Sequence, residues 1–421
     1  MAPTVSALNR FSFILIYLLL MLSSISIGIM ISLLPLVART ANIPDVLIVS
    51  AQAITAGSWI FVAGAWARLA RRRGRKFVIM IGGVGLSVGC FAAGGVILVA
   101  VTGLVAPMAA LAMLVAARIT NGAVGLAVVP AAQAFVVERT LVSRRTIVMS
   151  SLASAQTLGT ILGPAAAPFM THIPGLGLAG PMVLVATLCT LILPVLAFIL
   201  PHDRPPIATT PASEATASAA EGVWRMKAMR GYLMYSTIMA TAAIGLIQTI
   251  GFLILDTLAG APEEAQFWIG QAIAAGAVAT LLVQLVITPA LKPTPQTMML
   301  AAPIISIVGL SMLALVPGYW LIVLGTVTAN IGFALGRPGV ATAASLVLPI
   351  SRQTELAAAI LSTASAGVVI GPVLAVLLYS VWQPLTFLLL AMSQVAALVI
   401  ALRNRHPASP RIGEANLRGE T

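Results

Sequence analysis

Twelve apolar stretches, each long enough to cross a lipid bilayer, dominate this sequence. A membrane-spanning helix needs about 20 apolar residues, whereas transmembrane strands show short segments of alternating polarity. Only 8% of the residues are charged, against roughly 25% in soluble domains. We therefore predict an all-α polytopic membrane protein of twelve transmembrane helices. Their expected ranges are 11–38, 46–67, 77–101, 108–136, 146–170, 181–200, 232–256, 267–290, 298–316, 320–346, 356–380 and 385–402.

The basic residues that give the net charge of +12 are concentrated in the predicted loops and the C-terminal tail. If both termini lie in the cytoplasm, nearly all Lys and Arg residues of the loops fall on the cytoplasmic side, and Arg39 is the one cation on the other side. This distribution obeys the positive-inside rule. It indicates a lipid bilayer as the partner and argues against nucleic acid. The compact loops and the composition rich in Ala and Arg favour a bacterial inner membrane.

One sequence pattern occurs twice. Ser154-x4-Gly159-x3-Gly163-Pro164 returns 208 residues later as Ser362-x4-Gly367-x3-Gly371-Pro372, within the fifth and eleventh predicted helices. A polar segment that contains prolines separates the sixth helix from the seventh. Related halves are typical of secondary transporters. We predict two pseudo-symmetric six-helix bundles, with a bundle at 1–200, a cytoplasmic linker at 201–231, a bundle at 232–402 and a cytoplasmic tail at 403–421.

The chain resembles the major facilitator superfamily, and within it the twelve-helix drug/proton antiporter branch. The predicted loop Arg71-Arg72-Arg73-Gly74-Arg75-Lys76 is similar to the Asp-Arg-x-Gly-Arg-Lys end of a family signature, with Arg71 in place of the Asp. In the family that Asp lies near the start of the eleventh helix, and here Glu355 is in the first turn of that helix, which suggests that the two charges are exchanged. We hypothesise that Glu355 faces these arginines as a cytoplasmic gate. The alternative is a solvated cluster that sets topology.

Two further motifs carry the resemblance. Arg118 and Asn121 match a pattern of the fourth helix, with Asn121 in place of Gln, which implies a role for Arg118 in proton coupling; the alternative is a structural brace. Gly159, Gly163 and Pro164 resemble the antiporter motif, which is associated with exporters. Because Gly367, Gly371 and Pro372 repeat it, symmetric helix packing explains the pattern equally well.

We find no acidic residue near the middle of a predicted helix. Asp256, at the outer end of the seventh, is the best candidate for proton handling, although a plain interfacial acid is the alternative. Arg337 lies inside the tenth helix, where a guanidinium can hold a carboxylate or phosphate. Arg118 and Arg337 together favour a neutral or anionic substrate. Six polar residues are candidate cavity liners: Gln52, Asn121, Gln133, Gln156, Gln248 and Asn330.

The sequence shows no metal-ligand cluster, no nucleophile with a His partner and no phosphate-binding loop. We therefore expect no enzyme activity, cofactor or metal. The leading hypothesis is alternating access by a monomer that exports small organic compounds in exchange for protons. The alternative is import or export of an organic anion, such as a carboxylate-bearing siderophore. A non-transporting membrane receptor is a third possibility that the short loops disfavour.

Overall fold

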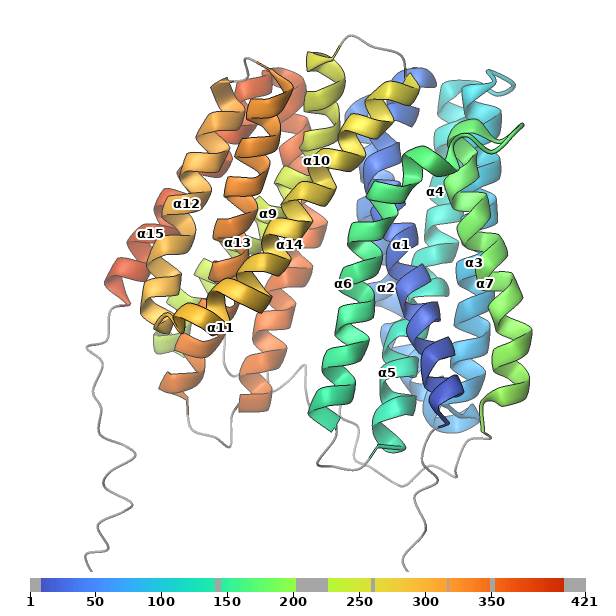
Figure 1. Ribbon diagram of the computed structural model, residues 1–421, viewed down its shortest axis with the longest axis horizontal. Helices are drawn as coiled ribbons and strands as arrows, with labels where there is room; N and C mark the ends of the chain where they lie inside the picture. Colours follow the sequence, from blue (N-terminus) through green and yellow to red (C-terminus); the bar gives the residue numbers. More distant parts are fainter. Residues whose placement is uncertain are drawn as a thin grey trace, which may run out of the picture.

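The computed structural model describes residues 9–140, 145–201, 226–258, 262–315, 318–348 and 353–404. Within these ranges the helices form two bundles that lie side by side (Figure 1). The first bundle contains α1 Arg10–Thr40, α2 Asp45–Arg73, α3 Arg75–Val101, α4 Pro107–Ala123, η1 Gly125–Ala127, α5 Val128–Glu138, α6 Arg145–Met170, η3 Gly177–Ala179 and α7 Gly180–Ile199. The second contains α9 Lys227–Thr257, α10 Pro262–Leu282, the π-helical η4 Val283–Ile287, α11 Thr288–Leu291, α12 Pro295–Leu315, α13 Tyr319–Val347, α14 Gln353–Val381 and α15 Gln383–Arg403. Most of the predicted linker and nearly all of the predicted tail lie outside the described residues.

The described helices are consistent with twelve transmembrane segments. Nine are long and apolar enough to cross a membrane, or ten if the bent helix α2 counts as one span. Helices α6 and α14, of 26 and 29 residues, bring the number of long helical segments to twelve. The predicted fold class, an all-α polytopic protein built from two bundles, is therefore confirmed.

The predicted loop after the second helix is wrong. The chain from Arg68 to Arg73 continues helix α2, and only Gly74 separates α2 from α3. Arginine is a good helix former, and cations are favoured in a last helical turn by the helix dipole. Gly74 ends the helix with a φ of 95°, a conformation that favours glycine. A run of charges therefore marked the end of the apolar segment but not the end of the helix.

The predicted helix 108–136 is broken in the structure. Helix α4 ends at Ala123 and α5 begins at Val128, with the short helix η1 between them. The indole Nε1 of Trp66 donates to the carbonyl of Ala123 at 2.6 Å. This bond satisfies a backbone carbonyl near the break, as membrane interiors require. The predicted helix 267–290 is likewise interrupted by η4.

The repeated motif packs one helix against another in the same way in both bundles. A Cβ atom built on Gly163 of α6 would lie 2.6 Å from the carbonyl oxygen of Ile25 in α1. A Cβ atom built on Gly371 of α14 would lie 2.9 Å from the carbonyl oxygen of Thr241 in α9. Gly159 and Gly367 make similar approaches one turn earlier. The motif therefore brings α6 onto α1 and α14 onto α9 at backbone distance.

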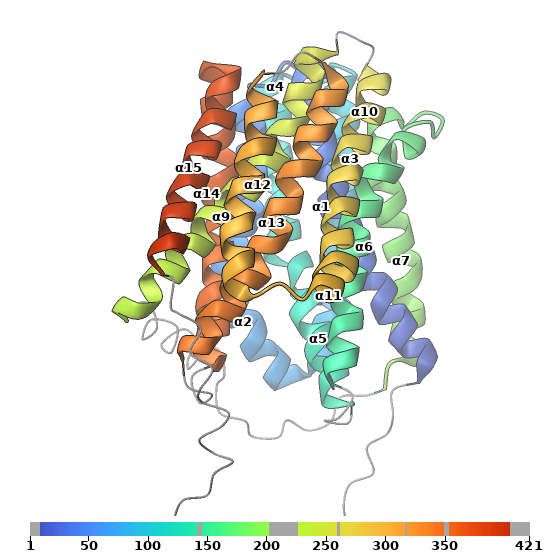
Figure 2. The same cartoon turned by 60° about the vertical axis from the view of Figure 1, so that its left-hand side comes forward.

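Helices α1 and α9 lie at the centre of the molecule, and they are the most deeply buried spans among those described. Contacts between the bundles pair α6 with α10 and α2 with α14, while α1 also touches α9 and α10 (Figure 2). By their order in the two bundles, α2 corresponds to α10 and α6 corresponds to α14. The contact of α6 with α10 is therefore the counterpart of the contact of α14 with α2. This part of the interface therefore follows the pseudo-symmetry of the bundles, whereas the contact of α1 with α10 has no counterpart of similar size between α9 and α2 among the described residues.

The packing role of the repeated motif predicts a specific sensitivity to one methyl group. Gly163→Ala must separate α1 from α6, and such overpacking costs about 1–3 kcal/mol. We expect a lower thermal unfolding temperature of the purified protein in detergent. The matched control is Gly95→Ala in α3, because nothing lies within 4 Å of a Cβ atom built there. Equal shifts in the two variants would contradict this role.

Candidate gate and buried polar site

An ion cluster joins the two bundles at one end of the molecule, here called the Asp256 end. Arg39 lies in the last turn of α1. Its Nη2 lies 3.0 Å from Asp45 Oδ2 at the start of α2 and 3.0 Å from Asp256 Oδ1 near the end of α9. Tyr379 of α14 donates its hydroxyl to Asp256 Oδ2 at 2.7 Å, and Gln383 Nε2 donates to Tyr379 at 3.0 Å. Arg39 is thus shared between an acid of its own bundle and an acid of the other.

The cluster is partly open to solvent. The side chains of Arg39 and Asp256 are 46% and 33% exposed, and that of Asp45 is 16% exposed. An exposed ion pair contributes about 0–1 kcal/mol. The contact between Arg39 and Asp256 is therefore weak enough to break during a conformational change.

Tighter contacts between the bundles lie further along α1 toward its N-terminus. Gln266 of α10 donates from Nε2 to Ser32 Oγ of α1 at 3.1 Å, and both side chains are buried. Gly251 of α9 faces Pro35 of α1, where an added Cβ atom would lie 2.6 Å from Pro35 Cγ. Small residues permit this close approach of helices in a membrane.

A similar contact joins α6 to α10. Gly270 of α10 faces the carbonyl oxygen of Pro164 and the ring of Pro168 in α6. In these contacts the prolines belong to the first bundle and the glycines to the second. Pro164 thus belongs both to the repeated motif and to the interface between bundles, while its counterpart Pro372 is buried in α14.

A second polar site lies inside the first bundle, around Arg118 of α4. The Arg118 side chain is buried, with Nε donating to Thr55 Oγ1 at 3.0 Å and Nη2 donating to Gln52 Oε1 at 2.6 Å. Both acceptors belong to α2. The ion pairs in the described part of the chain are Arg39–Asp45, Arg39–Asp256 and Arg75–Glu138, and none includes Arg118. A buried cation with neutral partners is energetically costly, which makes it a functional candidate.

The remaining predicted liners are distributed over several helices. Asn121 lies one turn after Arg118, with Nδ2 4.0 Å from Cys90 Sγ. Gln133 of α5 donates to Gln156 of α6 at 3.5 Å. Gln248 is buried in α9, and Asn330 donates to the carbonyl of Thr326 in its own helix at 2.9 Å. The structure therefore joins Gln52 to Arg118 and Gln133 to Gln156, but it does not gather all six into one site.

Arg337 of α13 is exposed and takes part in none of the ion pairs of the described residues. Gly336, its neighbour, faces Met239 and Tyr235 of α9. Arg337 therefore lies in a different bundle from Arg118. Its guanidinium is available to a partner that comes from outside the protein.

The opposite end of the molecule, here called the Arg75 end, carries the predicted gate arginines. Arg75 pairs with Glu138 at the end of α5, within the first bundle. Lys76 Nζ donates to the carbonyl of Leu200 at 2.6 Å, while Arg71 and Arg72 are exposed on the last turn of α2. Glu355 belongs to α14, but its side chain lies outside the described residues, so its pairing with the arginines stays a hypothesis.

Four residues that complete these sites were not predicted from the sequence. Thr55 and Trp66 support the fourth helix from α2, and Tyr379 and Gln383 extend the ion cluster. Each has an ordinary place in an apolar helix or at its end. The signal that was available is the isolation of Arg39 on its side of the predicted membrane, because a lone cation there needs nearby acids.

The fold is similar to that of many solved structures, three of which are described here. A nucleoside transporter, NupG, in a mutant form has a TM-score of 0.74 at 12% identity, and the match covers 94% of this chain and 100% of NupG. A bacterial homologue of the human lysosomal transporter Spinster, inward-facing and unoccupied, has a TM-score of 0.70 at 14% identity, with 97% and 100% covered. A POT family transporter in complex with 5-aminolevulinic acid has a TM-score of 0.65 at 15% identity, with 93% and 94% covered.

These low identities show the common fold alone. No curated protein sequence gives a significant match. The family model described as Major Facilitator Superfamily matches residues 18–295, which is about two thirds of the sequence. This match identifies the superfamily and does not distinguish the drug/proton antiporter branch from its other branches. The chain belongs to the major facilitator superfamily.

Proposed function

We propose that this protein is a secondary active transporter that works by alternating access. The observation that carries the proposal is the Arg39–Asp256 contact, which holds the two bundles together at one end. That end can open only if this contact and the Ser32–Gln266 hydrogen bond behind it both break. Two rigid bundles that rock around a central site are the mechanism typical of such folds.

The distribution of positive charge supports an orientation in the membrane. The Arg75 end carries five basic residues around Gly74, within 71–76, and therefore faces the cytoplasm. The Asp256 end then faces outward. Both termini are then cytoplasmic. In this proposal the protein is a monomer in a bacterial inner membrane.

We further propose that transport is coupled to protons and directed outward, with small organic compounds as substrates. Protonation of Asp256 would remove its charge and weaken its contact with Arg39. A ligand shifts a conformational equilibrium only by binding its states differently, and this contact supplies such a difference for a proton. The repeated motif does not indicate a direction of transport, because it packs helices in both bundles.

A second candidate function is transport of an organic anion, and the exposed Arg337 favours it. An unpaired guanidinium can bind a carboxylate by two parallel hydrogen bonds. The neighbouring structures do not distinguish the two candidates, because they include a nucleoside transporter and a transporter in complex with 5-aminolevulinic acid. The substrate therefore has to be found by experiment.

Reconstituted protein should move protons when a substrate is added. In vesicles that contain a pH-sensitive dye and carry a pH gradient, we expect proton movement with some of a panel of cationic, neutral and anionic compounds. Arg337→Ala should lose anionic substrates alone if the protein carries organic anions. Protein-free vesicles are the control. Absence of proton movement with every compound would contradict proton coupling. Uptake of a radiolabelled compound, measured in the same vesicles, would then test transport itself.

Loss of the charge on Asp256 should loosen the Asp256 end. We expect Asp256→Asn to shift the population toward opening at that end by at most about fivefold, since an exposed pair contributes about 1 kcal/mol or less. The measurement is the distance between spin labels on cysteines at Leu104 and Trp382, which are exposed on the two bundles. Asp45→Asn is the matched control, because it takes a charge from Arg39 within one bundle. A larger shift in the control would count against a gate at Asp256.

Arg118→Met separates a functional arginine from a structural brace. Replacing a buried charged group by an apolar one of similar length is often neutral for stability. We therefore expect an unfolding temperature close to that of the original protein, with proton-coupled transport reduced by about tenfold or more, equivalent to 1.4 kcal/mol in the barrier. Unchanged transport together with a lower unfolding temperature would instead assign Arg118 a bracing role.

A further inference from the structure

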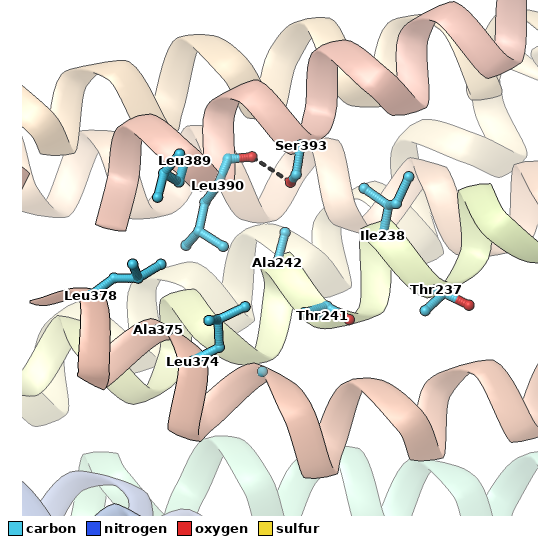
Figure 3. A pocket seen from close by; sticks show the side chains of 11 residues that line it. Thr237, Ile238, Thr241, Ala242, Leu374, Ala375, Leu378, Leu389, Leu390 and Ser393 are labelled. Atoms are coloured by element: carbon cyan, nitrogen blue, oxygen red, sulfur yellow. Dashed lines mark hydrogen bonds between the residues drawn. The ribbon is translucent and has the colours of Figure 1, made fainter. Parts of the chain in front are cut away.

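A groove of about 200 Å³ lies between three helices of the second bundle, and none of its lining residues belongs to either polar site (Figure 3). Helix α9 forms its floor with Thr237 and Thr241. Helix α14 forms one wall, which includes Gly371 and Leu374, and α15 forms the other, which includes Leu389 and Ser393. Gly371 belongs to the repeated motif, so the groove lies beside the close contact of α14 with α9.

The groove offers hydrocarbon contacts and few polar ones. None of its lining residues is charged. The hydroxyl of Thr237 donates to the carbonyl of Leu233 at 2.9 Å, and that of Ser393 donates to the carbonyl of Leu390 at 2.6 Å (Figure 3). Cavities lined in this way exclude water and accept apolar guests. A polar solute would gain little here.

The surroundings of the groove indicate what covers it. Leu374 and Leu389 line the groove and are 46% and 37% exposed, and Leu377 and Leu388 nearby are 48% and 41% exposed. Helix α15 is a candidate membrane span, and α9 is another. This apolar flank therefore faces the hydrocarbon of the bilayer, so lipid chains lie at the mouth of the groove.

The first bundle has larger side chains at the corresponding positions. A Cβ atom built on Gly163 approaches the carbonyl of Ile25, and one built on Gly371 approaches the carbonyl of Thr241. Ile25 of α1 therefore corresponds to Thr241 of α9, and Met21, one turn earlier, corresponds to Thr237. Where α1 carries long aliphatic side chains, α9 carries two threonines. The shorter side chains of Thr237 and Thr241 therefore leave room that Met21 and Ile25 would fill at the corresponding positions.

We propose that an acyl chain of a membrane phospholipid occupies this groove and packs along α9 between α14 and α15. Transfer of a lipid chain from the bilayer into the groove gains no hydrophobic free energy, so the gain comes from dispersion contacts with the surrounding side chains. The bound chain fills the space beside the Gly371 contact. It therefore supports the packing of α14, the helix that touches α2 of the other bundle.

The test uses a phosphatidylglycerol that carries a diazirine in one acyl chain, in vesicles with the reconstituted protein. After illumination, we expect adducts to concentrate on peptides that contain the groove residues. Thr237→Met with Thr241→Ile reproduces the residues of α1, and it should lower the yield of these adducts several-fold. Adducts on the rest of the apolar surface should stay unchanged.

Thr328→Met is the matched control. Thr328 lies in α13, outside the groove, and also donates its hydroxyl to a carbonyl of its own helix, that of Leu324, at 2.8 Å. This variant should keep the adducts in the groove. If the double variant fails to fold, Thr237→Met alone partly fills the groove and serves instead.

Thermal unfolding supplies a second readout. Added phospholipid should raise the unfolding temperature of the delipidated protein more than that of the filled variant. Adducts spread evenly over the apolar surface, or retained in full by the filled variant, would overturn the proposal. Displacement of the adducts by a transported compound would do so as well, because it would assign the groove to substrate rather than to lipid.

Discussion

Close approach of helix backbones is the interaction on which this structure depends. Lipid tails are as apolar as leucine, so no hydrophobic effect holds one membrane helix against another. Stability must come from contacts at van der Waals distance, and large side chains would prevent them. Gly163 and Gly371 allow α6 to reach α1 and α14 to reach α9. Each bundle is thereby organised around its most buried helix, and the same arrangement appears twice.

The same principle explains the contact between the bundles. Prolines of α1 and α6 meet glycines of α9 and α10, and a buried hydrogen bond between Ser32 and Gln266 crosses the interface nearby. The ion cluster of Arg39 and Asp256 lies toward the solvent from these contacts. The interface at this end thus combines the close packing of small residues with a charge contact between the two bundles. Neither part alone would give a closure that is both tight and reversible.

Hydropathy and the repeated motif predicted the architecture well, because both depend on local sequence. The partners across the interface were not predictable in this way. Arg39 and Asp256 are 217 residues apart, and no pattern near either residue indicates the other. The arginines before Gly74 were assigned to a loop because they end the apolar run, although arginine also favours helix. Arg118 could be identified because a cation in an apolar helix is rare, whereas its partner Thr55 resembles many other buried threonines.

The turn at Gly74 has a mechanical consequence for the first bundle. A single residue joins two helices of 29 and 27 residues, so neither helix can slide along the other by a helical turn. Helix α2 touches α14 of the second bundle, and α3 packs against α4 and α7 of its own. A displacement of α2 at the interface is therefore passed through this one-residue connection to α3 and to the helices that pack against it.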